Sequence, residues 1–185
     1  SDHLVRSFNK TYNMNTIITN CSNNYGPYQN LEKFIPKIIT NILTNKKIPV
    51  YGKGNQIRDW LHVVDHCKAI NLIAESKAYG HNFNIGGNNE ITNINIVKKI
   101  CKRLHQLKYK RNINYNLPFF KNNTNPINLI KYVKDRPGHD FRYSINSSKL
   151  QKQLNFKSQT NFSNGLNKTI DWYLNNYNWW KNQII

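Results

Sequence analysis

The sequence predicts an α/β fold built on a mainly parallel sheet. Short β-branched runs alternate with longer stretches in which apolar residues recur at helical spacing. The segments behind several strands are rich in Asn, Gly and Pro, and in open α/β sheets ligands bind at this edge. With 185 residues, the chain is long enough for one domain with a sizeable core.

The first predicted elements are a helix over residues 2–13 and a strand over 16–20. Apolar residues recur every three to four positions through the helix, and the strand is a run of Thr and Ile. Residues 21–30, CSNNYGPYQN, follow this strand and predict a loop, because Asn, Gly and Pro cluster there.

The next part of the chain predicts a helix, a strand and a turn. The helix over 32–45 carries its apolar residues on one side, and Pro36 fits within the first turn, where a proline costs no hydrogen bond. The apolar run 48–51 indicates a short strand, and the glycines of 52–55 indicate a turn after it.

The middle of the chain repeats the alternation of strand and helix. A strand over 58–63 precedes a helix that ends at Ser76, and Asp65 is the expected N-cap of that helix. A strand over 83–85 then ends at a pair of glycines.

Thr92 or Asn93 is the expected N-cap of an amphipathic helix, along which five apolar residues form a stripe. The remaining predicted elements are, in order, a long aperiodic loop over 108–129, a strand over 130–133, the segment DRPGHD at 135–140, a short helix over 147–154 and an amphipathic helix over 163–178.

The pattern lacks a complete dinucleotide-binding unit. No Gly-rich fingerprint follows a strand, since Gly52-x-Gly54 is too short and Gly86-Gly87 lacks the third glycine. There is also no first βαβ unit. We therefore expect the chain to be the second half of a larger α/β protein.

The formal net charge of +18 would ordinarily indicate a nucleic-acid or acidic-membrane partner. Here the lysines are scattered, as on a solvated surface. Asn, Ile and Lys have the AT-richest codons and dominate the chain, so drift in base composition explains the charge. We expect no nucleic acid and no membrane among its partners.

The cysteine pattern and the absence of targeting signals indicate the cytoplasm. Cys21, Cys67 and Cys101 are isolated and form no CxxC pair, which predicts buried free thiols in a reducing compartment. No apolar run approaches twenty residues, and no signal peptide is visible.

Polar residues at the ends of predicted elements could converge on one edge of the sheet. They are Asn23, Asn24, Lys33, Tyr51, Arg58, Asn93, Arg136 and His139. Arg58 and Arg136 suit a diphosphate, because a planar guanidinium contacts phosphate oxygens bidentately. Asparagines suit sugar hydroxyls and base edges, and an aromatic wall could come from Tyr25, Phe34 and Tyr51. This is the pattern of a sugar-nucleotide site.

Each assignment has a structural alternative. The two asparagines could hydrogen-bond their own turn, Arg58 and Asp59 could form a surface ion pair, and Asp135–Gly138 has the order of a plain turn. His62 and His66 stand at i, i+4, but without a third ligand at a sensible spacing we expect no metal site. No catalytic dyad is evident in the sequence.

Four long segments stand out in this order: TNCSNNYGPYQNLEKFIP, PVYGKGNQIRDWLHVVDHCKAI, NIGGNNEITN and DRPGHDFRYSI. Together they resemble the C-terminal half of the dTDP-glucose 4,6-dehydratases, NAD-dependent lyases of the extended short-chain dehydrogenase/reductase type. The other segments alone would indicate only the wider group of sugar-nucleotide epimerases and dehydratases. The segment DRPGHD is the one that is typical of the dehydratases within this group. The fold implied is the C-terminal half of a Rossmann-like NAD(P)-binding protein. Its last parallel strands and its small substrate-binding domain are interleaved over residues 1–185.

The resemblance also implies roles for the site residues. Asn23 would contact the sugar nucleotide and Asn24 the NAD side, so the loop over 21–30 would lie between cofactor and substrate. The substrate pocket would be formed by Lys33, Phe34, Pro49, Val50, Tyr51, Arg58 and Asn93, and completed by Asp135, Arg136, Pro137, Gly138 and His139. The helix over 2–13 would help to build a homodimer interface.

The implied reaction converts dTDP-glucose to dTDP-4-keto-6-deoxyglucose and water, in dTDP-rhamnose and cell-surface polysaccharide synthesis. In the family, the Gly-rich NAD loop, the Asp-Glu acid/base pair and the Tyr-xxx-Lys dyad all lie upstream of the part that this chain matches. We therefore expect the chain alone to be inactive, to bind no NAD and, with an uncovered sheet edge, to be poorly soluble. An inactive remnant of the enzyme and a basic nucleic-acid-binding module are the alternatives.

Salt-dependent retention on heparin, compared with dTDP binding, separates the nucleic-acid alternative from the nucleotide pocket. Binding that follows phosphate charge weakens steeply with salt, whereas a shaped pocket discriminates dTDP from a random oligonucleotide. We expect dTDP to be preferred at moderate salt. Tighter binding of the oligonucleotide under the same conditions would contradict the pocket.

Overall fold

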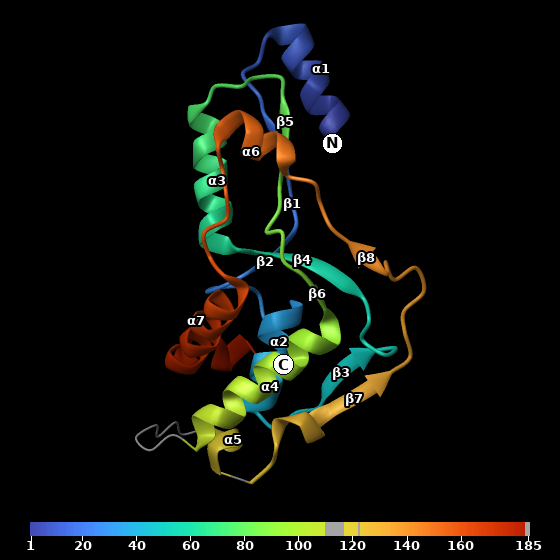
Figure 1. Ribbon diagram of the computed structural model, residues 1–185, viewed down its shortest axis with the longest axis vertical. Coiled ribbons are helices and arrows are strands. Elements are labelled where there is room, and N and C mark those ends of the chain that lie inside the picture. Colours follow the sequence, from blue (N-terminus) through green and yellow to red (C-terminus); the bar gives the residue numbers. More distant parts are fainter. Residues whose placement is uncertain (110–116, 122, 184–185) are drawn as a thin grey trace.

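The computed structural model describes residues 1–109, 117–121 and 123–183 (Figure 1). Helices and strands alternate along them, as the sequence predicts. In chain order the elements are α1 (Asp2–Tyr12), β1 (Ile18–Cys21), β2 (Asn23–Tyr25), α2 (Phe34–Leu43), β3 (Ile48–Tyr51), β4 (Ile57–His62), α3 (Val63–Glu75), β5 (Asn82–Ile85), β6 (Glu90–Thr92), α4 (Asn93–Lys108), α5 (Pro118–Lys121), η1 (Pro126–Leu129), β7 (Ile130–Val133), β8 (Arg142–Tyr143), α6 (Ser148–Leu154), α7 (Phe162–Asn175), α8 (Tyr177–Trp180) and η2 (Lys181–Gln183).

The strands of the described chain form three small sheets in place of the single sheet that was predicted. One sheet pairs β1 with β5, a second orders β2, β4 and β6 with β8 beside β4, and a third pairs β3 with β7. All of these pairings are parallel except that of β4 with β6. The chain passes from the first sheet to the second at Ser22. The N–H of Ser22 donates to the carbonyl of Ile85 in β5, and the next residues, those of β2, pair with β4.

Several predicted boundaries are wrong. Residues 23–25 were expected in a loop but form β2, because their backbone pairs in register with Trp60–His62. The short strands β6 and β8 were not predicted. The aperiodic region 108–129 contains α5, with Phe119 fully buried, and the 3₁₀ turn η1. Residues 110–116 and 122 of that region lie outside the described chain.

Asp65 does not cap α3 as predicted. The cap is His62, whose Nδ1 accepts the N–H of Val64 at 3.4 Å. Asp65 is 2% exposed and accepts hydrogen bonds from the Ser158 hydroxyl at 2.9 Å and the Thr160 N–H at 2.8 Å. Its carboxylate therefore ties α3 to the segment that follows α6.

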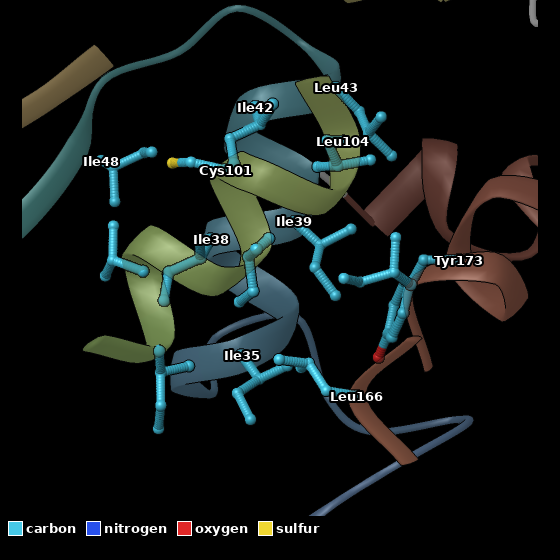
Figure 2. Packing of buried hydrophobic residues seen from close by; sticks show 14 of the residues in the cluster. Ile35, Ile38, Ile39, Ile42, Leu43, Ile48, Cys101, Leu104, Leu166 and Tyr173 are labelled. Atoms are coloured by element: carbon cyan, nitrogen blue, oxygen red, sulfur yellow. The ribbon is translucent and has the colours of Figure 1, made fainter. Parts of the chain in front are cut away.

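Buried apolar side chains form two separate clusters. The larger lies among α2, α4 and α7, where Ile39, Ile42, Leu104 and Tyr173 are wholly buried and pack together (Figure 2). The smaller lies among β4, β5, α3 and α6 and is formed by Leu61, Ala69, Ile73, Phe83, Ile85 and Leu150. Figure 1 shows the same division, with α3 and α6 beside β1 and β5, and with α2, α4 and α7 gathered at the other end.

Helix α1 has no buried residue. Its apolar side chains Leu4, Phe8 and Tyr12 are 63%, 40% and 68% exposed and lie on one face at helical spacing. Within the described chain, no helix has both the length and the apolar character that a membrane span requires.

A close backbone approach at Gly87 makes this position intolerant of any side chain. A Cβ built on Gly87 would lie 1.9 Å from the carbonyl oxygen of Trp60. We expect Gly87→Ala to lower the free energy of unfolding by about 3 kcal/mol or more, because the obstacle is backbone that cannot rotate away. Urea denaturation measures the change.

Gly138→Ala is the matched control. Gly138 has φ +66 but a Cβ there would meet nothing within 4 Å, so only the left-handed backbone conformation opposes the substitution, at about 1–2 kcal/mol. Equal effects of the two variants would contradict the close approach at Gly87.

The buried carboxylate of Asp65 predicts a pH-dependent stability. Burial alone would raise its pKa, but hydrogen bonds from Thr160 and Ser158 outweigh burial, and the pKa lies below its ordinary value. A depressed native pKa gives stability that is complete above the unfolded pKa of about 4 and is lost as pH falls through the native pKa. We expect Asp65→Ala to cost about 1–3 kcal/mol near neutral pH, and the difference from wild type to narrow below about pH 4.

Asp171→Ala is the comparison for Asp65→Ala. Asp171 pairs with Arg103 at 3.2 Å on the surface, and such pairs contribute at most about 1 kcal/mol. Denaturation at a series of pH values separates the two carboxylates. A constant difference between Asp65→Ala and wild type from neutral to strongly acidic pH would contradict this account.

Candidate functional site

A cavity of about 300 Å³ lies between α2, the strands β3 and β4, and the segment after β7. Nine residues with a predicted substrate role line it: Asn23, Phe34, Pro49, Val50, Tyr51, Arg58, Asn93, Arg136 and His139. The other residues with a predicted substrate role, Lys33, Asp135, Pro137 and Gly138, do not line it. The structure thus brings together residues that are up to 116 positions apart in the sequence (Asn23 to His139).

Six residues that line the cavity were not predicted from the sequence to belong to a site: Glu32, Lys37, Ile38, Asn41, Ile48 and Trp60. A signal for some of them was present. Lys37 and Asn41 follow Phe34 at i+3 and i+7, so all three lie on one face of α2. Polar residues on the same face as an aromatic side chain indicate a face that is only partly packed.

Strand alternation separates the two neighbouring asparagines of β2. Successive side chains on a strand point to opposite faces, and Asn23 lines the cavity while Asn24 does not. Asn24 Nδ2 donates to the carbonyl of Ser22 at 3.1 Å, as the turn alternative proposed. Its Oδ1, however, is buried without a hydrogen-bond partner in the described chain.

Arg58 is held by backbone carbonyls at the wall of the cavity. Its Nη1 donates to the carbonyl of Ile57 at 2.7 Å and its Nη2 to that of Asp140 at 2.9 Å. Burial lowers the pKa of this guanidinium, while the nearby Asp140 raises it and the nearby Arg136 lowers it further. Arginine nevertheless stays charged at neutral pH, so a cation is fixed in place here.

The alternative of a surface ion pair between Arg58 and Asp59 is wrong. Asp59 is 1% exposed, and its carboxylate accepts the N–H groups of Gly87 at 2.9 Å and Asn89 at 2.7 Å. Being neighbours on β4, Arg58 and Asp59 face opposite sides of the strand. Asp59 therefore holds β4 to the segment at Gly87 and Asn89, while the side chain of Arg58 lines the cavity.

The charges around the cavity favour an anionic ligand. Three cationic side chains, Lys37, Arg58 and Arg136, line it, against the single carboxylate of Glu32. Arg136 lies close enough to Arg58 to lower the pKa of the Arg58 guanidinium. An anion with two or more charged oxygens would relieve this repulsion and receive charge-assisted hydrogen bonds.

The aromatic wall differs from the predicted one. Tyr51 lines the cavity, and so do Phe34 and Trp60, whose rings stack at 6.1 Å with 27° between their planes. Tyr25 was expected in the wall, but it is 1% exposed and packs in the larger core against Phe162. Its ring belongs to the core because β2 pairs with β4 and turns it inward.

The segment DRPGHD forms a turn and also contributes to the cavity. Pro137 and Gly138 make the turn, with Gly138 at φ +66, while Arg136 and His139 line the cavity on either side of it. Asp135 accepts hydrogen bonds from the side chain of Gln56 at 2.6 Å and from the N–H of Arg136 at 2.8 Å. It also contacts His139 Nδ1 at 2.7 Å.

Metal-ligating and nucleophilic groups are sparse. The described residues hold no group of three or more His, Cys, Asp or Glu side chains placed to bind a metal ion. The three cysteines are free, but only Cys101 is buried, whereas Cys67 is exposed, so the expectation of buried thiols is right for one of them. Burial raises the pKa of the Cys101 thiol to about 12, which makes it a poor nucleophile.

Fold and cavity together define an α/β protein with a cavity lined by more cationic than anionic side chains. The chain belongs to the GDP-mannose 4,6 dehydratase family, whose model matches residues 1–169. It is 49% identical over 181 residues to a dTDP-glucose 4,6-dehydratase of Escherichia coli, a match that covers 98% of this chain and 48% of that protein. The resemblance inferred from the motifs is therefore confirmed. The chain spans about half the length of the curated relatives it matches.

Solved structures confirm the predicted fold class. The dTDP-glucose 4,6-dehydratase of Bacillus anthracis, determined in complex with NAD, matches with a TM-score of 0.82 and 40% identity over 99% of this chain and 52% of its own. The corresponding enzyme of Streptomyces venezuelae, also determined with NAD, matches with a TM-score of 0.86 and 34% identity over 100% of this chain and 51% of its own.

Proposed function

We propose that this chain forms the substrate-binding part of a dTDP-glucose 4,6-dehydratase. The observation that carries the proposal is the cationic cavity, in which Arg58 and Arg136 stand beside Asn23 and an aromatic wall. Relatives named dTDP-glucose 4,6-dehydratase match nearly the whole chain at 49% and 46% identity, which supports the choice of substrate.

The diphosphate of dTDP-glucose would lie between Arg58 and Arg136. Arg58 is already oriented by two backbone carbonyls, so little side-chain entropy remains to be lost when the ligand binds. The base would pack against the apolar side chains of β3 and Phe34. Asn23 and Asn93 would bind sugar hydroxyls or base edges, because amide groups both donate and accept.

Three residues that were expected to form the pocket, Lys33, Pro137 and Gly138, are not in the cavity wall, and we propose that they act from its rim. Lys33 is exposed at the start of α2, and Pro137 and Gly138 are exposed in the turn after Asp135. From these positions they would close the site over the bound nucleotide.

One observation fits a cofactor on the far side of β2. The buried Oδ1 of Asn24 has no hydrogen-bond partner in the described chain, and an unpaired buried acceptor is costly. We propose that Asn24 would face NAD in the complete enzyme, while Asn23 faces the sugar. The strand would then separate cofactor from substrate by its alternation alone.

The proposed reaction oxidises the sugar at C4, eliminates water across C5 and C6, and returns the hydride to C6. Bound NAD would supply the hydride acceptor and donor. The residues of this chain would fix the nucleotide so that the sugar stays oriented through all three steps. The groups that transfer protons and the Gly-rich cofactor loop are proposed to lie outside these 185 residues, and the chain alone is proposed to be inactive.

We also propose a homodimer in the cytoplasm, without nucleic acid or membrane as partners. The exposed apolar face of α1, formed by Leu4, Phe8 and Tyr12, supports an interface along this helix. Contiguous exposed apolar residues of this kind commonly mark contact surfaces.

Arg136→Gln tests the proposed function in the full-length protein. Arg136 lines the cavity and is otherwise exposed, so its replacement should leave the melting temperature unchanged. We expect the affinity for dTDP-glucose, measured by isothermal titration calorimetry, to fall about tenfold to a hundredfold, because hydrogen bonds to charged groups contribute about 1.5–3 kcal/mol.

Arg142→Gln is the control. Arg142 is also an exposed arginine, but it forms a bidentate pair with Glu90 at 2.6 and 2.7 Å and does not line the cavity. Its replacement should leave the affinity for dTDP-glucose unchanged. Equal affinities of wild type and Arg136→Gln, or equal losses in both variants, would count against the proposed function.

A further inference from the structure

Asp135 and His139 differ in their relation to the cavity although they are in contact. His139 lines the cavity, with its side chain only 7% exposed, whereas Asp135 does not line it. The contact joins His139 Nδ1 to Asp135 Oδ1 at 2.7 Å. This contact engages Nδ1 alone, so the other ring nitrogen of His139, Nε2, stays outside it.

The carboxylate of Asp135 is itself fixed. Its Oδ2 accepts from Gln56 Nε2 at 2.6 Å, and its Oδ1 accepts from the N–H of Arg136 at 2.8 Å. Gly52 also lies close, since a Cβ built on it would be 3.3 Å from Oδ2. The N–H of Arg136 and the ring of His139 both contact Oδ1, so this oxygen is held beside the ring by contacts separate from those to Oδ2.

The chemistry of the pair then determines which nitrogen carries the proton. An ionised carboxylate only accepts hydrogen bonds, and a neutral imidazole has one donor and one acceptor nitrogen. The carboxyl of Asp135 is ionised near neutral pH, because its hydrogen bond with His139 lowers its pKa below the ordinary value. The proton of the neutral ring therefore lies on Nδ1, and Nε2 is the acceptor.

We propose that Asp135 is a positioning residue that holds His139 as the Nδ1–H tautomer and so presents Nε2 to the cavity as an acceptor for a hydroxyl or N–H group of the ligand. The identity of that ligand, a dTDP-sugar, rests on the proposed function. Asp135 would thus influence binding without touching the ligand, which explains why it lies outside the cavity wall.

Nitrogen-15 NMR of the full-length protein, labelled at histidine and measured at about pH 8 where imidazole is largely neutral, tests the tautomer directly. The signals of His139 are assigned by their loss in His139→Gln. We expect wild type to show protonated Nδ1 and unprotonated Nε2. Asp135→Asn keeps an acceptor oxygen and should keep this pattern, whereas Asp135→Leu should shift the ring toward the Nε2–H form that water favours.

Binding of dTDP-glucose should follow the tautomer. We expect Asp135→Leu to weaken it about tenfold, the effect of losing one hydrogen bond, and Asp135→Asn to restore most of the affinity. Gln56→Leu is the control, because it removes the contact to Oδ2 and leaves that to Nδ1 intact. It should change neither the ring signals nor the affinity by more than about twofold.

Three results would overturn the inference. They are an Nε2–H tautomer in wild type, unchanged ring signals in Asp135→Leu, and losses of affinity as large in Gln56→Leu as in Asp135→Leu. The last would mean that Asp135 only anchors the turn. The ring signals are read without ligand, and those of wild type decide on the tautomer even if Asp135→Leu does not fold. If wild type bound no dTDP-glucose but showed the Nδ1–H ring, the proposed function would fail and the positioning by Asp135 would stand.

Discussion

Strand β4 carries side chains for both cores and for the cavity, and its register is the constraint on which the rest depends. Alternation sends Trp60 to the larger cluster and Leu61 to the smaller one, while Arg58 faces the cavity from the side of Trp60. The buried carboxylate of Asp59 fixes this register by accepting two backbone N–H groups. A slip of one residue would exchange every face, so that a carboxylate would replace the guanidinium in the cavity.

Most elements of the fold were predictable because their residues carry the necessary period. The apolar stripe of α4 and the short apolar runs of β3 and β7 are local signals, and the structure confirms these elements. Strand β2 was missed because its polar residues resemble a loop, and only pairing with the distant β4 makes it a strand. The cap of α3 was assigned to Asp65 by residue type, but the donors whose hydrogen bonds this buried carboxylate accepts lie 93 and 95 residues further along the chain.

Site residues could be predicted where a charged side chain stands at an unusual position in the sequence. Two arginines at loop positions stood out, and the structure places both at one cavity. Ile48 and Trp60 could not be identified, because an apolar residue in a cavity wall looks like any core residue in the sequence. Tyr25 shows the reverse error, since an aromatic residue beside a polar loop packs in the core. What separates wall from core is the distance between elements, which no local pattern records.

The tryptophans of this chain are divided between two environments. Trp172, Trp179 and Trp180 belong to the C-terminal helices, where Tyr28 packs against the first two. Trp60 alone of the four lines the cavity, stacked on Phe34 and with an indole N–H that has no partner in the described chain. Indole emission responds to nearby dipoles and charges, so an anion that entered the cavity would change the emission of Trp60, while the other three tryptophans, which do not line the cavity, would supply a background. The fluorescence of Trp60 would therefore report whether the cavity is occupied.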